Sequence, residues 1–355
     1  MTVDEHESCL FEFESLSGNL AYQCVYGENR WQKEAALYDS KPNDVLALPR
    51  FKHIDGAVLS YNNWADIDRL LQTITHIAAV FEKNGMSVPC IAVGGKHGNA
   101  CGADIGANPL EALTRMLGGD KLAIFGGVVM TNFPITMGEG ETMREWGTEF
   151  GVKRILDCVV APSIDEEGKR ELTRKGGKCR MVVNPALESI GLGSLDTSYR
   201  VRPVRGGFLL QENYISVFDR NDPELRCIGE IGDVQWPDVY LAWAVGSTSN
   251  SNTITLVRNA KLIGNAVGQQ DRVGAAQLAL RRAERGEHVV ALATAYSDSF
   301  FPFVDGPRTL ITAGVRTILA TSGSVNDDQV VELCRRTGTT LLLLPDAKAR
   351  GFFGH

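Results

Sequence analysis

An adjacent lysine and histidine, Lys96 and His97, stand in the most polar glycine-rich segment of the sequence, residues 94–102. Histidine exchanges a proton near neutral pH, so the pair offers a proton acceptor next to a fixed positive charge. The segment follows a short apolar run, 89–95, that predicts a buried strand, and loops at strand ends are where α/β proteins place ligands. Its spacing differs from the GxxxxGK[ST] pattern of a phosphate-binding loop. The pair therefore predicts proton-transfer chemistry in a loop after a strand.

A second segment, 296–305, combines a carboxylate with aromatic side chains. Asp298 follows an apolar strand, and three phenylalanines surround one proline: Phe300, Phe301, Pro302 and Phe303. Aromatic clusters are common in protein cores, but the same cluster could form a wall for a planar ligand beside the carboxylate. Both interpretations are open.

Two further polar segments suit either ligand binding or local structure. Residues 248–253 are amides and hydroxyls of the kind that form turns. Residues 268–272 stand at the start of a predicted helix, where backbone N–H groups and Arg272 suit an anion or an amide. Ordinary helix capping is the alternative there.

Amphipathic helices alternate with short apolar strands along the chain. Helical spacing is clearest at 66–84, where we expect Asp66 to cap the start and Gly85 the end. The other expected helices are 109–118, 141–150, 165–175, 237–246, 270–286 and 326–336. The other expected strands are 121–130, 153–161, 179–183, 254–258, 289–294, 316–320 and 340–344. This alternation predicts an α/β fold. A polar stretch near 186–206 suggests a boundary near residue 200, which gives units 1–200 and 201–355.

Composition narrows the class of protein. The 355 residues carry 36 Lys and Arg against 43 Asp and Glu, a net charge of −7 that does not favour nonspecific binding to nucleic acid or an anionic membrane. No apolar run approaches the roughly 20 residues that span a bilayer, and the acidic start lacks the features of a signal peptide. Eight cysteines form no CxxC pair, which favours buried reduced thiols over disulfides or zinc ligands. We expect a cytoplasmic enzyme without a metal.

Taken in order, these segments resemble the C-terminal transformylase half of the bifunctional AICAR transformylase/IMP cyclohydrolase family. The resemblance runs from about residue 15 to residue 355. Six collinear blocks carry it: Tyr26-Gly-Glu-Asn-Arg-Trp-Gln32 (YGENPHQ in the family), Leu59-Ser-Tyr-Asn-Asn63 with Asp66 (LSYNNxxD), Lys96-His-Gly-Asn-Ala-Cys-Gly102 (KHANPCG), Phe125-Gly-Gly127 (FGG), Ser251-Asn252 with Gly268-Gln-Gln-Asp-Arg272 (SN and GQxxR), and Ser297-Asp-Ser-Phe-Phe-Pro-Phe303 (SDAFFPF). Ser322-Gly-Ser324 and the final Phe-Gly-His355 resemble the family's closing segments. The cyclohydrolase half is expected to be absent.

The resemblance implies a fold, partners and roles. The fold would be two cytidine-deaminase-like, three-layer α/β/α units without catalytic zinc, and the HxE…PCxxC pattern of zinc deaminases is indeed missing. The co-substrates would be 10-formyltetrahydrofolate and an aromatic amine, bound at sites shared in a homodimer. Implied catalytic residues are Lys96, His97 and Asn252. Implied acceptor contacts are Tyr26, Gly27, Asn63, Asn99, Gly126, Gly127, Gln269, Arg272 and Arg350. Implied folate contacts are Asp298, Phe300, Phe301, Pro302, Ser322 and Gly323.

Several positions depart from the family pattern on the acceptor side. The family has Arg where this chain has Val25, Pro-His where it has Arg30-Trp31, and Lys where it has Asn250. The closing RxFxH is rearranged to 350–355 with one extra residue. A lost arginine removes a charge-assisted contact of about 1.5–3 kcal/mol to a phosphate. Three hypotheses follow: an AICAR transformylase, a one-carbon transferase for another aromatic amine, and a non-catalytic relative.

Overall fold

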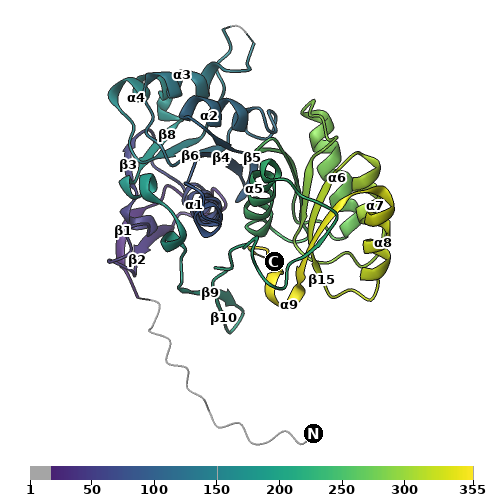
Figure 1. Cartoon of the computed structure of the whole chain (residues 1–355). Helices are drawn as coiled ribbons and strands as arrows, with labels where there is room; N and C mark the ends of the chain where they lie inside the picture. Colours follow the sequence, from purple (N-terminus) through teal and green to yellow (C-terminus); the bar gives the residue numbers. More distant parts are fainter. Residues whose placement is uncertain (1–16, 150, 355) are drawn as a thin grey trace, which may run out of the picture.

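A computed structural model describes residues 17–149 and 151–354, which contain two successive runs of elements (Figure 1). The first run is β3 (Lys52–Asp55), α1 (Tyr61–Lys83), β4 (Cys90–Lys96), β5 (Asn99–Gly106), α2 (Pro109–Leu117), β6 (Val128–Thr131), α3 (Met137–Glu145), β7 (Cys158–Ala161), α4 (Glu166–Leu172) and β8 (Arg180–Val183). The second is β11 (Arg226–Ile228), α5 (Trp236–Ser247), β12 (Ile254–Arg258), β13 (Lys261–Ala266), α6 (Arg272–Arg285), β14 (Thr294–Ser297), α7 (Asp305–Thr312), β15 (Thr317–Ser322), α8 (Asp327–Thr337) and β16 (Thr340–Pro345). The order of elements is the same in both runs.

The two runs also pair their strands in the same way. In the first, β4 is antiparallel to β5 and β6, and β7 and β8 follow in parallel; in the second, β12, β13, β14, β15 and β16 repeat this pattern. Strands β3 and β11 add antiparallel to the two outer edges. The runs meet where β13 lies antiparallel to β5, with Lys261 opposite Asp104. The result is one twelve-stranded sheet, β11-β16-β15-β14-β12-β13-β5-β4-β6-β7-β8-β3.

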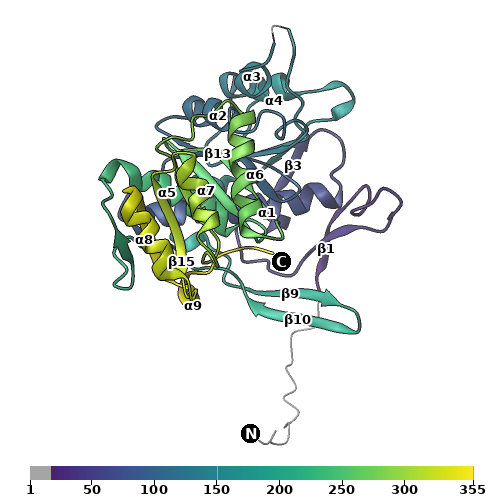
Figure 2. The same cartoon turned by 90° about the vertical axis from the view of Figure 1, so that its right-hand side faces the viewer.

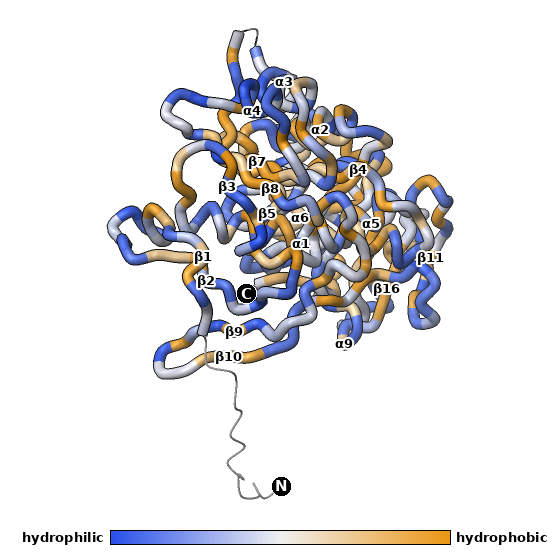
Figure 3. Tube along the Cα trace, turned by 90° about the vertical axis from the view of Figure 1, so that its left-hand side faces the viewer, coloured by the Kyte–Doolittle hydropathy of each residue, from blue (hydrophilic) through white to orange (hydrophobic). Residues whose placement is uncertain are grey.

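Helices cover both faces of this sheet. On one face, α1 and α5 contact each other and share a hydrophobic core with inward residues of both runs. On the other face, α2 and α3 form a second core, and α6, α7 and α8 a third. Strand residues alternate between faces: Leu256 belongs to the third core and the next residue, Val257, to the first. Hydrophobic segments accordingly concentrate in the strands (Figure 3).

Two hairpins and several short helices lie outside the sheet. The hairpins are β1 (Asn19–Gln23) with β2 (Ala36–Asp39), and β9 (Tyr199–Val204) with β10 (Gly207–Glu212), and both extend from the body on the side where the chain ends (Figure 2). Helix α9 (Asp346–Ala349) follows β16. The short 3-10 helices are Leu48–Arg50, Lys175–Gly177, Pro185–Ser189, Leu192–Ser194 and Asp233–Gln235.

The prediction that Asp66 caps the first long helix is wrong. Helix α1 begins at Tyr61, because the Ser60 side chain accepts a hydrogen bond from the Asn63 backbone N–H while Asn63 Oδ1 accepts from Ser60 N at 2.9 Å. This reciprocal cap satisfies N–H groups that the first helical turn leaves free. Asp66 therefore lies one turn inside the helix, and its carboxylate is available for another contact.

Other departures from the predicted elements also have local causes. The expected glycine-rich loop at 94–102 is a hairpin, since β4 runs to Lys96 and β5 begins at Asn99. The expected strand 121–130 is reduced to β6, because residues 121–126 form turns. The expected strand 289–294 begins only at Thr294. Hydrophobic periodicity did not predict strand β13 or helix α7, because short hairpin strands and helices of one or two turns carry little periodic signal.

Within the described residues no helix is both long enough and apolar enough to cross a membrane. The cysteines there are free thiols, and five of them are buried: Cys24, Cys101, Cys158, Cys179 and Cys334. Cys90 is half-buried, whereas Cys227 is exposed and departs from the prediction of buried thiols. Cys9 lies outside the described residues.

Candidate active site

The predicted pair Lys96 and His97 lies at the tip of the β4–β5 hairpin. His97 and Gly98 form its two-residue turn, with φ of +53° and +71°, and Lys96 pairs with Asn99 across it. Such a turn requires left-handed backbone at both central positions, which glycine adopts freely and histidine does not. His97 is therefore a strained residue at the outer end of the hairpin, and strained residues are common at functional sites.

Helix α1 holds this turn in place. Asp66 Oδ1 accepts the Gly98 backbone N–H at 2.6 Å, and Arg69 Nε donates to the Gly98 carbonyl at 3.1 Å. Burial raises the pKa of Asp66, although the Gly98 N–H and the neighbouring His97 act in the opposite direction. Asp66 belongs to a block named from the sequence, but its contact with the turn was not predicted.

Lys96 contacts the predicted Phe125-Gly126-Gly127 block. Its Nζ donates to the Phe125 carbonyl at 2.8 Å. Gly126 has φ of +70°, and a Cβ there would lie 3.9 Å from Lys96 Nζ. A Cβ on Gly127 would lie only 2.8 Å from the Gly95 carbonyl, so glycine is needed for this close approach. The two segments thus form one side of the site.

The loop between α5 and β12 brings the second run of elements to the same hairpin. Asn99 Oδ1 accepts the Asn250 backbone N–H at 3.1 Å, which joins β5 to the loop. Further along the loop, Asn252 Nδ2 donates to the Gln269 carbonyl at 3.0 Å, and Asn252 Oδ1 accepts from Arg272 Nη2 at 2.9 Å. The structure therefore connects Asn99, Asn252, Gln269 and Arg272 through neighbouring contacts.

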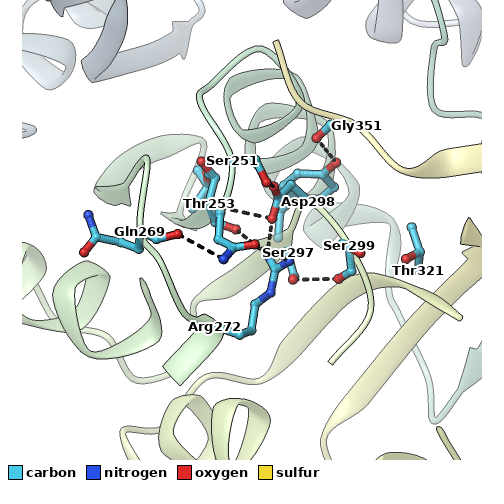
Figure 4. A network of polar contacts seen from close by, with 12 residues as sticks. Ser251, Thr253, Gln269, Arg272, Ser297, Asp298, Ser299, Thr321 and Gly351 are labelled. Carbon is cyan, nitrogen blue, oxygen red and sulfur yellow. Dashed lines mark hydrogen bonds and ion pairs between the residues drawn. The ribbon is translucent and has the colours of Figure 1, made fainter. Parts of the chain in front are cut away.

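Asp298 is the buried centre of a polar network (Figure 4). Its side chain has no exposed surface and forms an ion pair with Arg272, which points toward it from the start of α6. Its carboxylate also accepts from Ser251 Oγ at 2.5 Å and from the Thr253 backbone N–H at 3.1 Å. These donors satisfy the hydrogen-bonding capacity of a carboxylate that has no access to water. In the described structure Asp298 organises the 251–253 loop and Arg272.

The aromatic residues that follow Asp298 divide between two environments. Phe301 is 3% exposed and belongs to the core under α6, α7 and α8, as the core interpretation predicted. Phe300 is half-buried, with the Arg350 guanidinium 5.6 Å from its ring centre and a Cβ on Gly323 3.8 Å from its ring.

Polar contacts surround Phe300 and the residues next to it. Asn326 Nδ2 donates to the Pro302 carbonyl at 2.6 Å, and Ser322 Oγ donates to the Leu344 carbonyl at 3.4 Å. Arg350 also pairs with Asp346 at 2.6 Å. Burial raises the pKa of Asp346, but hydrogen bonds from Arg350 and Thr321 outweigh it and leave that pKa below its usual range.

The residues predicted near the start of the chain lie around the entry to α1. The Tyr26 carbonyl accepts the Tyr61 backbone N–H at 3.0 Å, and a Cβ on Gly27 would lie 3.0 Å from Gln32. Asn63 is 4% exposed: both of its side-chain groups are used, one in the helix cap and the other donating to Asp157 Oδ2 at 2.7 Å.

A cavity of about 370 Å³ opens between α1, the hairpin tip and the α5–β12 loop. It is lined by Glu28, Asn62, Ala65, Asp66, Arg69, His97, Gly98 and Asn250. Only His97 among these was predicted to take part in catalysis. Glu28, Asn62 and Arg69 were missed as site residues, although Asp66 and Arg69 are three residues apart and so share one face of α1. A larger cavity, about 510 Å³ and lined in part by Asp68 and residues 193–198, contains none of the predicted residues.

Comparisons with known proteins place the chain in a family. The AICARFT/IMPCHase bienzyme family matches residues 4–282. The bifunctional purine biosynthesis protein PurH of Cutibacterium acnes is 34% identical over 93% of this chain and 58% of its own length. The PurH proteins of Shouchella clausii and Deinococcus radiodurans are 32% and 30% identical, over 89% and 96% of this chain and 56% and 62% of their lengths. The chain thus spans about three-fifths of these relatives. It belongs to the AICARFT/IMPCHase bienzyme family, a family of purine-biosynthesis proteins.

Proposed function

We propose that the protein transfers a formyl group from 10-formyltetrahydrofolate to the aromatic amine of AICAR, giving formyl-AICAR. The observation that carries this proposal is the contact between the hairpin that bears Lys96 and His97 and the loop that contains Asn252. Asn99 Oδ1 accepts from Asn250 N at 3.1 Å, so groups from both runs of elements surround one cavity. Residues far apart in the sequence line this cavity, which supports the proposal of a site for two substrates.

The chemistry explains why these residue types are needed. The lone pair of an aromatic amine is delocalised into its ring, so the amine attacks a formyl carbon only weakly. His97 would accept a proton from the amine as its nitrogen bonds to the formyl carbon, and Lys96 would stabilise the negative charge on the formyl oxygen. Collapse then breaks the bond from carbon to N10 of the folate, and tetrahydrofolate leaves with a proton.

The other predicted residues would hold the two substrates. Asn252, kept in place by Arg272 and Gln269, would orient the amine. We propose the half-buried Phe300, with Gly323 and Arg350 beside it, as the surface that receives the planar part of the folate. Phe301 would support it from the core.

We further propose that the two runs of elements are cytidine-deaminase-like units and that the protein acts as a homodimer with shared sites. The identical strand order of the runs supports the first point. Exposed apolar residues on the two hairpins support the second: Leu20, Tyr38, Tyr199 and Leu209 are 60%, 59%, 53% and 59% exposed. Light scattering at micromolar concentration measures the assembly directly, and an active monomer would contradict the shared site.

A second candidate function is one-carbon transfer to a different aromatic amine. Val25 stands where the family pattern has an arginine; it is 46% exposed and brings no donor for a phosphate. Trp31 nearby is 77% exposed and adds apolar surface. These two residues favour an acceptor without a phosphate.

One assay separates these functions. The purified protein is mixed with 10-formyltetrahydrofolate and with AICAR, its dephosphorylated riboside or other aromatic amines, and tetrahydrofolate release is followed with mass spectrometry of the product. Formyl-AICAR formed preferentially from the nucleotide supports the first function, and preference for a phosphate-free amine supports the second. If no acceptor releases tetrahydrofolate above the rate without protein, both are wrong and the protein is a non-catalytic relative.

A further inference from the structure

Arg69 contacts three segments that are remote from one another in the sequence. From α1 its guanidinium donates to the Gly98 carbonyl at the hairpin tip and to the Thr248 carbonyl at 3.0 Å in the α5–β12 loop. It also donates to Asn250 Oδ1 at 3.2 Å and to the Phe353 carbonyl near the end of the chain. One side chain therefore fixes the position of three backbone segments around the cavity.

The contact with the hairpin tip restrains His97 directly. Gly98 is held on both of its polar groups, by Asp66 on the N–H and by Arg69 on the carbonyl. The N–H belongs to the peptide that joins His97 to Gly98 and the carbonyl belongs to the next peptide, so the two contacts restrain the peptides on both sides of Gly98, and the first of these adjoins His97. Helix α1 is itself anchored in the core by Ile67 and Leu70, which are 0% and 1% exposed.

The contact with the chain end extends the same restraint to the Asp298 network. Two guanidinium groups contact the Phe353 ring, that of Arg69 at 4.4 Å from the ring centre and that of Arg200 of β9 at 3.7 Å. The Phe353 N–H donates to the Ser249 carbonyl at 2.9 Å, and the Gly351 N–H donates to the Asp298 carbonyl at 3.2 Å. The segment 351–354 thus lies across the loop that Arg69 contacts.

The charged guanidinium of Arg69 donates its hydrogen bonds to neutral acceptors. None of the described carboxylates lies within ion-pair distance of it, and each of its four hydrogen bonds goes to a carbonyl oxygen. Burial lowers the pKa of Arg69 to about 10, and the neighbouring Arg200 acts in the same direction. The side chain is therefore charged at neutral pH, and hydrogen bonds from a charged donor are stronger than those from a neutral one.

We propose that Arg69 is the positioning residue of the active site, holding the His97–Gly98 turn, the 248–252 loop and the 351–354 segment in the arrangement that formyl transfer needs. The expected effect of Arg69 on the rate of formyl transfer rests on the proposed function. A planar fork with five donors reaches several carbonyls at once, which a lysine ammonium at the same position does not. Arg69 does not need to contact the reacting atoms.

The test compares Arg69→Ala and Arg69→Lys with Arg200→Ala, a matched control that loses the other guanidinium in contact with the same ring. We expect Arg69→Ala to lower kcat by about 10²-fold with a smaller change in KM, because misplacement of about 1 Å costs this much. Arg69→Lys should recover only part of the loss, and Arg200→Ala should leave kcat nearly unchanged. Added guanidinium ion, but not an equal concentration of sodium chloride, should partly restore Arg69→Ala.

Hydrogen exchange provides a readout that does not depend on activity. In Arg69→Ala the amides of Gly98, Asn250 and Phe353 should exchange faster, while the rest of the sheet keeps its protection. Unchanged exchange at all three amides, or a loss of kcat in Arg200→Ala as large as in Arg69→Ala, would overturn the proposal. If the native protein transfers no formyl group, the proposed function fails, and hydrogen exchange still decides whether Arg69 positions these segments.

Discussion

His97 combines a side chain that can exchange a proton with an unusual backbone conformation. A residue with φ of +53° at the tip of a two-residue turn is kept in that conformation only if its surroundings impose it. Here Asp66 contacts the next peptide, and Lys96 is fixed on the other side by the Phe125 carbonyl. The imidazole is thus presented to the cavity from a restrained backbone, which is what proton transfer to a bound substrate requires.

This arrangement leads to a prediction at His97. His97→Ala should lower the rate of formyl transfer by about 10²–10⁴-fold, the usual loss when a positioned general base is removed. Stability should fall little, because alanine removes no buried contact of the imidazole at this hairpin tip. Steady-state kinetics with the preferred acceptor and a thermal melt check both points. Near-normal turnover in the variant would assign the proton transfer to another group.

The sequence identified the type and the neighbourhood of these residues but not their contacts. Lys96, His97, Asn99 and Asn252 were named, and the structure connects their segments. Arg69 was not named, because an arginine on an amphipathic helix has the same pattern as an ordinary exposed charge. Its four acceptors come from three segments that only the folded chain brings together.

At the scale of elements, the contacts at the start of α1 offer a second role for one predicted residue, Asn63. Asn63 is implied by the family resemblance to contact the acceptor, yet its side chain completes the cap at Ser60 and reaches Asp157. A cap side chain contributes about 1 kcal/mol. These contacts favour a structural role.

Asn63→Ala separates the two roles. We expect the free energy of unfolding to fall by about 1–2 kcal/mol, from the lost cap and the lost hydrogen bond to Asp157, while KM for the acceptor stays unchanged. Denaturant unfolding and steady-state kinetics measure these quantities. Asn62→Ala on the exposed neighbour serves as the control for stability. A raised KM with unchanged stability would instead show that Asn63 binds the acceptor.

Helices and strands could be predicted where burial imposes a hydrophobic pattern on the sequence. They could not be predicted where turns determine the backbone. Strand β12 was predicted with its observed bounds, and α6 within two residues at its start. Glycines at 94, 95, 98 and 102 predict an irregular loop, whereas the structure forms the β4–β5 hairpin there. Gly98 provides the left-handed turn, whereas Gly94, Gly95 and Gly102 allow close packing: a Cβ at Gly102 would lie 2.3 Å from the Met116 carbonyl.

At the scale of the whole molecule, a buried histidine makes stability depend on pH. His76 on α1 has no exposed surface, donates from Nδ1 to the Gln72 carbonyl at 2.8 Å, and stacks on Tyr214. Burial lowers its pKa to about 4, against the effect of the Gln72 carbonyl. Between about pH 6.5 and pH 4 the unfolded chain therefore binds a proton that the folded chain does not, so acidification favours unfolding.

The expected result is a loss of up to about 3 kcal/mol of stability as the pH falls from 6.5 to 4. His76→Phe removes the titrating group and keeps an aromatic ring, so its stability should fall less steeply over the same range. Denaturant unfolding at several pH values compares the two slopes. Equal slopes would mean that His76 is protonated in the folded protein or contributes nothing to acid unfolding.

The antiparallel junction of β5 and β13 has a further consequence, for aggregation. A strand edge with unpaired N–H and C=O groups is a template for pairing with another molecule. At this junction β5 and β13, the edge strands of the two halves, lie next to each other inside the sheet. The edges left to the twelve-stranded sheet are β11, from Arg226 to Ile228, and β3, from Lys52 to Asp55. Both are short and bear charged side chains, features that protect natural sheets from edge-to-edge polymerisation. In the described residues the twelve-stranded sheet thus ends on short strands and offers no long edge on which fibrils could grow.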